Sequence, residues 1–166
     1  MSCSLRPVGR AQRARLERLT AATGLFQPDE VAIAVELLDA ALDGDDDYRW
    51  LGAFSGVELV GYACWGPTPG TTGTYDLYWI VVDPAWQGKR VGTQLLASVE
   101  DRVTTDHGRL IIVETSSRAD YGPTRAFYER RGYARAALIP GYYAAGDDLV
   151  IYLKDLTHGV VARATA

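Results

Sequence analysis

The sequence predicts a single α/β domain organised around a mixed β-sheet. Two apolar segments, residues 50–54 and 59–65, are separated by the turn-forming pair Ser55-Gly56, which is typical of an antiparallel hairpin. Farther along, a strand-like, a helical and a second strand-like segment occupy residues 75–114. A crossover of this kind joins parallel strands. We therefore expect a sheet of about six to seven strands, antiparallel in its first half and parallel in the middle, with helices on both faces.

Length and composition support one globular domain. The chain has 166 residues, of which 48% are hydrophobic and 23% charged, a balance found in folded proteins. We expect this domain to occupy residues 1–156 and a C-terminal tail to occupy residues 157–166. The net charge of -4 leaves no basic surplus for binding the backbone of a nucleic acid.

Membrane and metal partners also have no support in the sequence. No apolar stretch approaches the ~20 residues of a membrane helix, and the N-terminus lacks the pattern of a signal peptide. Cys3, in an expected N-terminal tail, and Cys64, in an apolar run, predict two free thiols and neither a disulfide nor a zinc site. We therefore expect a cytoplasmic protein with no metal, membrane or nucleic-acid partner, and we leave a homodimer open.

The first part of the chain predicts two helices. A segment at residues 9–23 carries leucines on one side and ends at Gly24. Residues 28–42 repeat apolar side chains at helical spacing after an acidic first turn. The acidic run at residues 43–47 lacks the regular spacing of cation ligands, so we expect a solvated loop there.

The second half of the chain alternates strands and helices. Residues 75–82 are apolar on both faces apart from Asp76, as in a central strand. The expected elements after this strand are a helix at residues 91–103, a strand at 109–114, a helix at 123–131, and strands at 133–139 and 149–153.

The loop before the helix at residues 91–103 has the chemistry of an anion site. It reads Gln87-Gly88-Lys89-Arg90-Val91-Gly92-Thr93. A helix N-terminus presents unpaired N–H groups and a positive dipole end, glycine lets an anion approach, and the basic side chains add charge. The loop lacks the GxxxxGK[ST] pattern of a Walker motif and does not directly follow its strand, as a dinucleotide fingerprint would. Glu114 lies about where such a fingerprint has its ribose-binding acid, so a dinucleotide-binding enzyme stays an alternative.

Two segments together resemble the GNAT superfamily of N-acetyltransferases. Residues 87–92 are similar to the family's coenzyme A pyrophosphate loop, which reads Gln or Arg, two residues, Gly, one residue, then Gly or Ala. Arg90 stands at the first glycine position of that pattern. Residues 127–133, FYERRGY, resemble the family's segment of aromatic, Tyr, three residues, Gly, aromatic, and Tyr121 stands where the family often has Asn. With the element order, the resemblance covers residues 5–153.

The resemblance implies a central parallel pair that splays apart and acetyl-CoA as the cofactor. It further implies that Tyr128 protonates the sulfur of the departing coenzyme A, for which a phenol that keeps its proton at neutral pH is suited. The residues implied to contact the cofactor are Ile80, Val81, Val82, Gln87, Gly88, Lys89, Arg90, Val91, Gly92, Thr93 and Tyr121.

Two carboxylates are candidates for the base that takes a proton from the acceptor amine. Asp76 interrupts an apolar strand and Glu114 ends the next one, at positions where members of the family carry catalytic acids; partial burial would raise the pKa of either. Residues 140–148 resemble the substrate-side hairpin of peptide acetyltransferases, in which Tyr142 and Tyr143 would orient an amine.

These expectations combine into one functional hypothesis with two alternatives. We expect an N-acetyltransferase that moves an acetyl group from acetyl-CoA to a primary amine by direct attack, with a peptide or amino-acid amine as the first hypothesis. A coenzyme A-binding regulatory module without turnover and the dinucleotide-binding enzyme are the alternatives.

Overall fold

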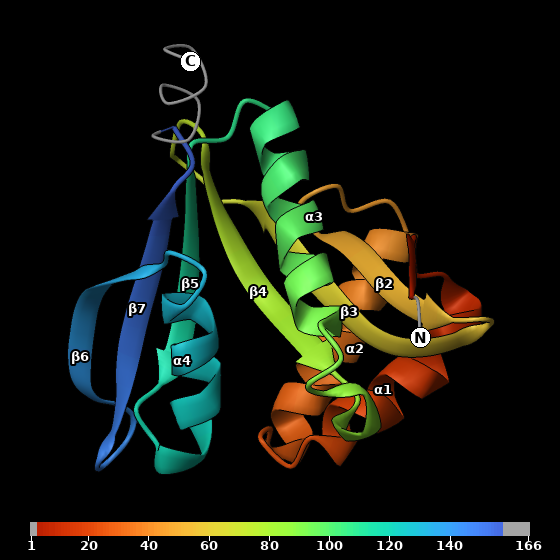
Figure 1. Cartoon of the computed structure of the whole chain (residues 1–166), viewed down its shortest axis with the longest axis horizontal. Coiled ribbons are helices and arrows are strands. Elements are labelled where there is room, and N and C mark those ends of the chain that lie inside the picture. The colour runs from red at the N-terminus through yellow and green to blue at the C-terminus, as the bar shows by residue number, and fades with distance from the viewer. Residues whose placement is uncertain (1–2, 158–166) are drawn as a thin grey trace. The chain divides into compact units, whose positions relative to one another are not determined.

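The structure is a computed structural model that describes residues 3–157 (Figure 1). Within this range the strands form one seven-stranded sheet in the order β1-β2-β3-β4-β5-β7-β6. The pair β4–β5 is parallel, whereas β1–β2, β2–β3, β5–β7 and β6–β7 are antiparallel. The predicted mixed sheet is therefore confirmed, and it is not the doubly wound parallel sheet of a dinucleotide-binding fold.

The chain forms two compact units, Met1–Gly66 with Tyr78–Arg102 and Pro67–Leu77 with Val103–Ala166. The first unit holds the expected helices and hairpin of the N-terminal half. Its elements are β1 (Ser4–Arg6), η1 (Arg10–Gln12), α1 (Arg13–Ala22), α2 (Pro28–Leu42), β2 (Arg49–Ser55), β3 (Glu58–Pro67), the last part of β4 (Thr74–Val82), η2 (Pro84–Trp86) and most of α3 (Val91–Thr105).

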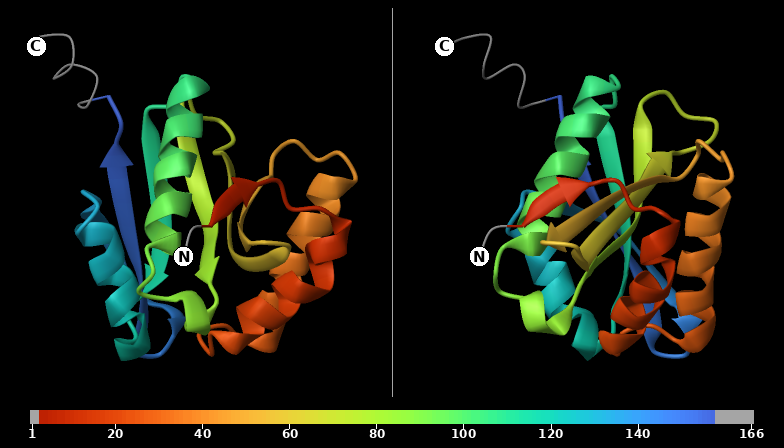
Figure 2. Two further views of the ribbon diagram at one scale, coloured as in Figure 1. Left: turned by 45° about the vertical axis from the view of Figure 1, so that its right-hand side comes forward. Right: turned by 90° about the vertical axis from the view of Figure 1, so that its right-hand side faces the viewer.

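Helices cover both faces of the hairpin in the first unit. On one face the Tyr62 hydroxyl lies 2.8 Å from Thr20 Oγ1 of α1. On the other, a Cβ at Gly61 would lie only 3.1 Å from Val91 Cγ1 of α3, so the absence of a side chain there lets α3 pack closely. Because neighbouring strand residues point to opposite faces, α1 and α3 lie on opposite sides of β3, as Figure 2 shows.

The second unit consists of the first part of β4 and the C-terminal half of the chain. Its other elements are β5 (Leu110–Ser116), η3 (Ala119–Tyr121), α4 (Gly122–Glu129), β6 (Ala134–Ala144) and β7 (Asp147–Asp155). Along β5 the buried side chains alternate with more open ones: Ile111 and Val113 are buried, whereas Glu114 is exposed. One face of β5 therefore contributes to the core and the other can carry polar chemistry.

Two expectations about the fold are wrong. Residues near Cys3 do not form a simple tail, because β1 pairs with β2 and places Leu5 opposite Ala53. Strand β6 does not end at residue 139 but continues to Ala144, so Tyr142 and Tyr143 belong to the strand and only a tight turn separates it from β7. The predicted tail at residues 157–166 lies outside the described residues apart from Thr157.

Two further features concern the described residues as a whole. No helix among residues 3–157 is long and apolar enough to cross a membrane. In the same range, no group of three or more His, Cys, Asp or Glu residues is arranged to hold a metal ion.

Candidate active site

The predicted anion loop lies in the first unit, between η2 and α3. Val91, Gly92 and Thr93 form the first turn of α3, at the end of the helix where the positive pole of the dipole lies. Gly88 has a φ of 75° and Arg90 a φ of 65°, so the chain turns twice through the left-handed region just before the helix begins. The N–H of Gln94 donates to the carbonyl of Arg90 at 3.0 Å and starts the helical ladder.

Arg90 itself adopts the conformation that glycine would take at this position of the motif. Gly88 and Arg90 both have a positive φ. The glycine at residue 88 therefore does not remove the need for a left-handed conformation at Arg90. A side chain with a Cβ in this region costs about 1–2 kcal/mol. The arginine keeps the loop geometry and adds a charged group beside the helix start.

Arg90→Gly should therefore stabilise the fold, by roughly 0.5–1 kcal/mol after the entropy cost of glycine is subtracted. Urea denaturation of both proteins measures the change. Lys89→Gly is the matched control, because it removes a neighbouring charge without relieving a left-handed φ, and it should not stabilise. Equal loss of stability in both variants would contradict the strain and would mean that the Arg90 side chain makes stabilising contacts.

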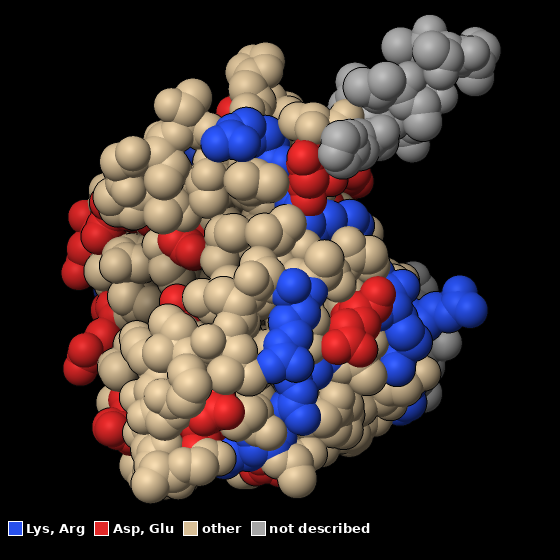
Figure 3. Space-filling view, turned by 90° about the vertical axis from the view of Figure 1, so that its left-hand side faces the viewer, with Lys and Arg blue, Asp and Glu red and all other residues tan. Residues whose placement is uncertain are grey.

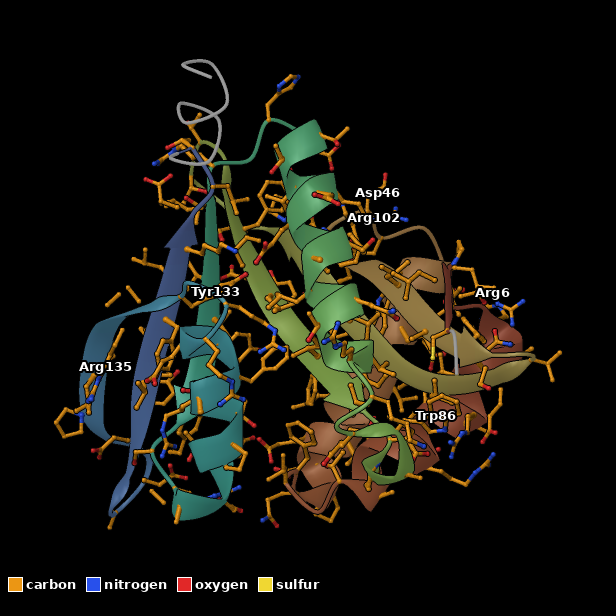
Figure 4. The ribbon with its side chains drawn as sticks, viewed as in Figure 1. Arg6, Asp46, Trp86, Arg102, Tyr133 and Arg135 are labelled. Carbon is orange, nitrogen blue, oxygen red and sulfur yellow. The ribbon has the colours of Figure 1, made fainter. Side chains whose placement is uncertain are left out.

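Sequence reasoning did not single out the residues that hold the start of this loop. The Arg15 guanidinium of α1 pairs with the Asp83 carboxylate, and Asp83 Oδ1 also accepts the N–H of Ala85 at 2.8 Å. Trp86, labelled in Figure 4, lies in η2, and the Lys89 Nζ sits 4.7 Å from the centre of its ring. Trp86 and Lys89 are three residues apart in the sequence, which is close enough to suggest a contact. The turn after η2 is what brings the two side chains together.

The end of β4 is built partly as core. Val81 is buried among side chains of α1, α2 and the hairpin, so this residue can meet a cofactor only through its backbone. Ile80 and Val82 are half-buried, and the Val82 carbonyl accepts the Gln87 side-chain amide at 3.4 Å. These groups and the loop fit the coenzyme A pyrophosphate, since a helix N-terminus, two cationic side chains and a glycine lie in one short segment.

Gly92→Val should test this fit directly. A branched side chain would cover the N–H groups of the helix start and should weaken acetyl-CoA binding at least about tenfold, while valine is no worse than glycine as a helix former. Calorimetric titration measures the affinity, and the far-ultraviolet spectrum should stay unchanged. Lys89→Ala should cost less, because a charge at an exposed site is screened. An unchanged affinity for Gly92→Val would place the phosphates elsewhere.

The two candidate bases lie on one face of the second unit. Asp76 of β4 is opposite Ile112 of β5 in the parallel register, and Glu114 follows Ile112 by two residues, so both carboxylates point to the same, more open side. The Thr68 hydroxyl donates to Asp76 Oδ2 at 2.6 Å. Thr68, which sequence reasoning missed in a loop rich in threonine, thus fixes the Asp76 carboxylate.

The environment separates the two carboxylates. Partial loss of water contact and then the negative charge of Asp76 raise the pKa of Glu114. Since the Glu114 residue is still exposed, solvent limits the size of that shift. Asp76 instead accepts a hydrogen bond from the Thr68 hydroxyl. The raised pKa makes Glu114 the candidate base to test first.

Tyr128 is buried inside the second unit. It is 3% exposed, and its ring lies 5.4 Å from that of Tyr133, which is labelled in Figure 4 and lies between α4 and β6. Burial and then the neighbouring Tyr121 raise the pKa of Tyr128, so its hydroxyl keeps its proton. Tyr121 is the residue before α4, and the Arg118 guanidinium lies 5.1 Å from the centre of its ring.

The predicted site residues therefore fall into two groups. The loop and the end of β4 belong to the first unit, and the two carboxylates, Tyr121, Tyr128, Tyr142 and Tyr143 belong to the second. A mixed sheet with one parallel pair and an anion loop before α3 is the architecture that the sequence resemblance implies for N-acetyltransferases.

Comparison with known proteins assigns the family. The acetyltransferase (GNAT) family matches residues 14–133. A protein assigned to the GNAT family from Desulfovibrio desulfuricans has a crystal structure that matches with a TM-score of 0.89 and 41% identity, over 93% of this chain and 99% of that one. The chain therefore belongs to the GNAT family of acetyltransferases.

Two further comparisons are informative. N-alpha-acetyltransferase RimI of Mycobacterium tuberculosis is 36% identical over 111 residues, which make up 64% of this chain and 66% of that protein. The chain spans smaller shares, 44% and 40%, of the other two curated relatives. The structure of an aminoglycoside 6'-N-acetyltransferase complexed with coenzyme A has the same fold, with a TM-score of 0.74, 19% identity and coverage of 92% of this chain and 97% of that one.

Proposed function

We propose that the protein transfers an acetyl group from acetyl-CoA to a primary amine. The observation that carries the proposal is the pair of carboxylates on the open face of β4 and β5, where partial burial and then the charge of Asp76 raise the pKa of Glu114. Membership of the GNAT family supports the reaction class and acetyl-CoA as the cofactor. The RimI relative supports an amine at the N-terminus of a protein or peptide as the first acceptor to test.

The residues of this chain divide the proton transfers between them. The loop at residues 87–93 would hold acetyl-CoA, which would supply the acetyl group to the amine nitrogen and would leave as the free thiol. Glu114 takes the proton from the amine, directly or through water. Partial burial, and then the charge of Asp76 held by Thr68, keeps the pKa of Glu114 raised. Tyr128 holds a proton on its phenol oxygen for the departing sulfur.

Most of the proposed cofactor contacts lie in the first unit, and Tyr121 stays a separate prediction. Backbone groups of residues 80–82 and the loop at residues 87–93 would hold the pantetheine arm and the pyrophosphate. We also propose that residues 1–156 act as one N-acetyltransferase domain and that the protein works in the cytoplasm.

A thermal-shift screen tests the cofactor. A ligand at about 100 times its dissociation constant stabilises a fold by about 2.7 kcal/mol, so acetyl-CoA should raise the melting temperature clearly. NAD and ATP should not, because the loop matches neither a dinucleotide fingerprint nor a Walker motif. A shift with NAD or ATP and none with acetyl-CoA would overturn the proposal. Release of coenzyme A in the presence of amines then distinguishes an enzyme from a regulatory module that binds the cofactor without turnover.

A further inference from the structure

One arginine of the first unit joins helix α1 to two strands of the sheet. Arg15 of α1 donates through Nη2 to the Asp83 carboxylate and through Nε to the Leu59 carbonyl at 3.1 Å. The same Nη2 lies 3.0 Å from Glu58 Oε1. Arg15 therefore binds the start of β3 and the residue that directly follows β4 at the same time.

Asp83 stands between the two segments of the first unit that are proposed to hold the cofactor. It follows residues 80–82 of β4 directly, and the loop at residues 87–93 begins after the short helix η2. The Asp83 N–H donates to the Val60 carbonyl at 2.9 Å, and the Asp83 carbonyl accepts the N–H of Trp86 at 2.7 Å. The position of Asp83 therefore sets how the end of β4 and the start of the loop lie relative to each other.

The pair of Arg15 with Asp83 is more shielded from water than the other arginine–aspartate pair of α1. The Arg15 and Asp83 side chains are 25% and 15% exposed, whereas those of Arg13 and Asp39, which join α1 to α2, are 47% and 32% exposed. Charges that are partly removed from water interact more strongly, and the loss of one partner leaves the other uncompensated. Without the Arg15 guanidinium, the Asp83 carboxylate should turn toward water and move the start of the loop with it.

Arg15 also compensates a negative charge at the entrance to an anion site. The chain has a net charge of -4, and acidic and basic side chains are interspersed on the face shown in Figure 3. Binding of an anionic cofactor therefore depends on local charges, which Lys89 and Arg90 supply on the loop itself. An unpaired Asp83 carboxylate would oppose them, because it repels a phosphate.

We infer that Arg15 is a positioning residue for acetyl-CoA. It acts through Asp83, which it holds at the point where residues 80–82 and the turn into the loop at residues 87–93 meet. This inference rests on the proposed function and adds a residue of α1 to the groups on which cofactor affinity depends. Because Arg15 acts through another residue, both the charge and the geometry of its side chain matter.

Arg15→Gln tests the inference by removing the cation while keeping a polar side chain. The dissociation constant for acetyl-CoA, measured by calorimetric titration, should rise about tenfold, the lower end of the effect of removing a group that orients the ligands at metal sites. Arg15→Lys keeps the charge but lacks the planar fork that contacts Asp83 and Leu59 together, so it should recover much of the affinity and cost only about threefold.

Asp83→Asn shows whether Arg15 acts through Asp83. Asparagine can still accept the Ala85 N–H, and it removes the repelling charge together with the ion pair, so this variant should cost less affinity than Arg15→Gln. In the Asp83→Asn background, Arg15→Gln should raise the dissociation constant by less than about twofold, because its partner is already neutral. A full tenfold loss in both backgrounds would show that Arg15 does not act through Asp83 and would overturn the inference.

Two control variants separate this role from a general effect on the fold. Arg13→Gln removes an arginine of the same helix and its pair with Asp39, makes the same change in net charge, and should leave the affinity for acetyl-CoA unchanged. Glu58→Gln removes the other carboxylate that Arg15 contacts, whose side chain is 59% exposed, and should also have little effect because water and salt screen such a pair. Urea denaturation of every variant shows that it is folded under the conditions of the titration.

The outcomes distinguish the inference from the proposed function. An unchanged affinity in Arg15→Gln, or an equal loss in Arg13→Gln, would overturn the inference and leave acetyl-CoA as the proposed cofactor. If Arg15→Gln does not fold, Arg15→Lys decides, and a wild-type affinity in that variant would overturn the inference. A wild-type protein that does not bind acetyl-CoA at all would overturn the proposed function together with the inference.

Discussion

Glu114→Gln should lower kcat by ~10² to 10⁴-fold, the usual contribution of a positioned general base. Glutamine keeps the size of the side chain and removes only its ability to take the proton. Affinity for acetyl-CoA, measured by calorimetry, should hardly change, because the anion loop is a separate group of residues. Steady-state kinetics should show equal losses in kcat and kcat/KM, as expected for an interaction made in the transition state.

The pH dependence assigns the base. A base works when it has lost its proton, and since the pKa of Glu114 is raised, the wild-type rate should climb with pH through a range above that of an ordinary glutamate. Glu114→Gln should abolish this acid limb. Asp76→Asn removes a like charge and should move the limb to lower pH without abolishing it. Loss of the limb in Asp76→Asn and its survival in Glu114→Gln would reverse the two roles.

Stability should respond in the opposite direction from activity. A carboxyl whose folded-state pKa is raised contributes stability that is complete below its unfolded pKa and is lost as the pH rises through its folded pKa. At neutral pH, Glu114→Gln should therefore be at least as stable as the wild-type protein toward urea. Strong destabilisation would show that the carboxylate has a structural partner and would weaken its assignment as the base.

The elements that the sequence predicted well are those with a strong periodic signal. The helices at residues 28–42 and 91–105 have apolar residues at helical spacing, and their bounds lie close to the predicted ones. The crossover from β4 to β5 predicted a parallel pair, because only a long connection can join strands in that direction. Local pattern and topology agree in these segments.

The features that escaped prediction depend on contacts between distant residues. Strand β1 is short and is defined by its pairing with β2, which no local pattern reveals. The irregular segment at residues 140–143 of β6 depends on Asp148 and Ser117, and a Pro-Gly pair favoured a turn there instead of a strand. The sequence marked both carboxylates as candidates, but only the register of β4 with β5 brings them to one face. The raised pKa of Glu114 and the bond from Thr68 to Asp76 then distinguish them.

Arg90 illustrates a limit of motif comparison. The pattern expects glycine at this position. With arginine there, the sequence alone does not predict the backbone conformation of the loop. The φ of 65° shows that the loop keeps its left-handed residue despite the substitution. The cost of one such residue is about 1–2 kcal/mol.

Tyr128→Phe should lower kcat by ~10² to 10⁴-fold if its hydroxyl protonates the departing sulfur. The variant removes one oxygen from a ring that is 3% exposed, so packing should be preserved and stability should change by no more than about 1 kcal/mol. The loss should appear in kcat and kcat/KM together, whereas a rise in KM alone would indicate a role in binding.

Tyr133→Phe is the matched control for this substitution, because Tyr133 is equally buried and its ring lies 5.4 Å from that of Tyr128. It removes a hydroxyl from the same aromatic cluster and should leave kcat nearly unchanged. A comparison of the two variants in single-turnover experiments isolates the chemical step from product release. If Tyr128→Phe keeps most of the wild-type rate where chemistry is rate-limiting, Tyr128 is only a core residue, whose burial raises its pKa. The sulfur then takes its proton from solvent or leaves unprotonated.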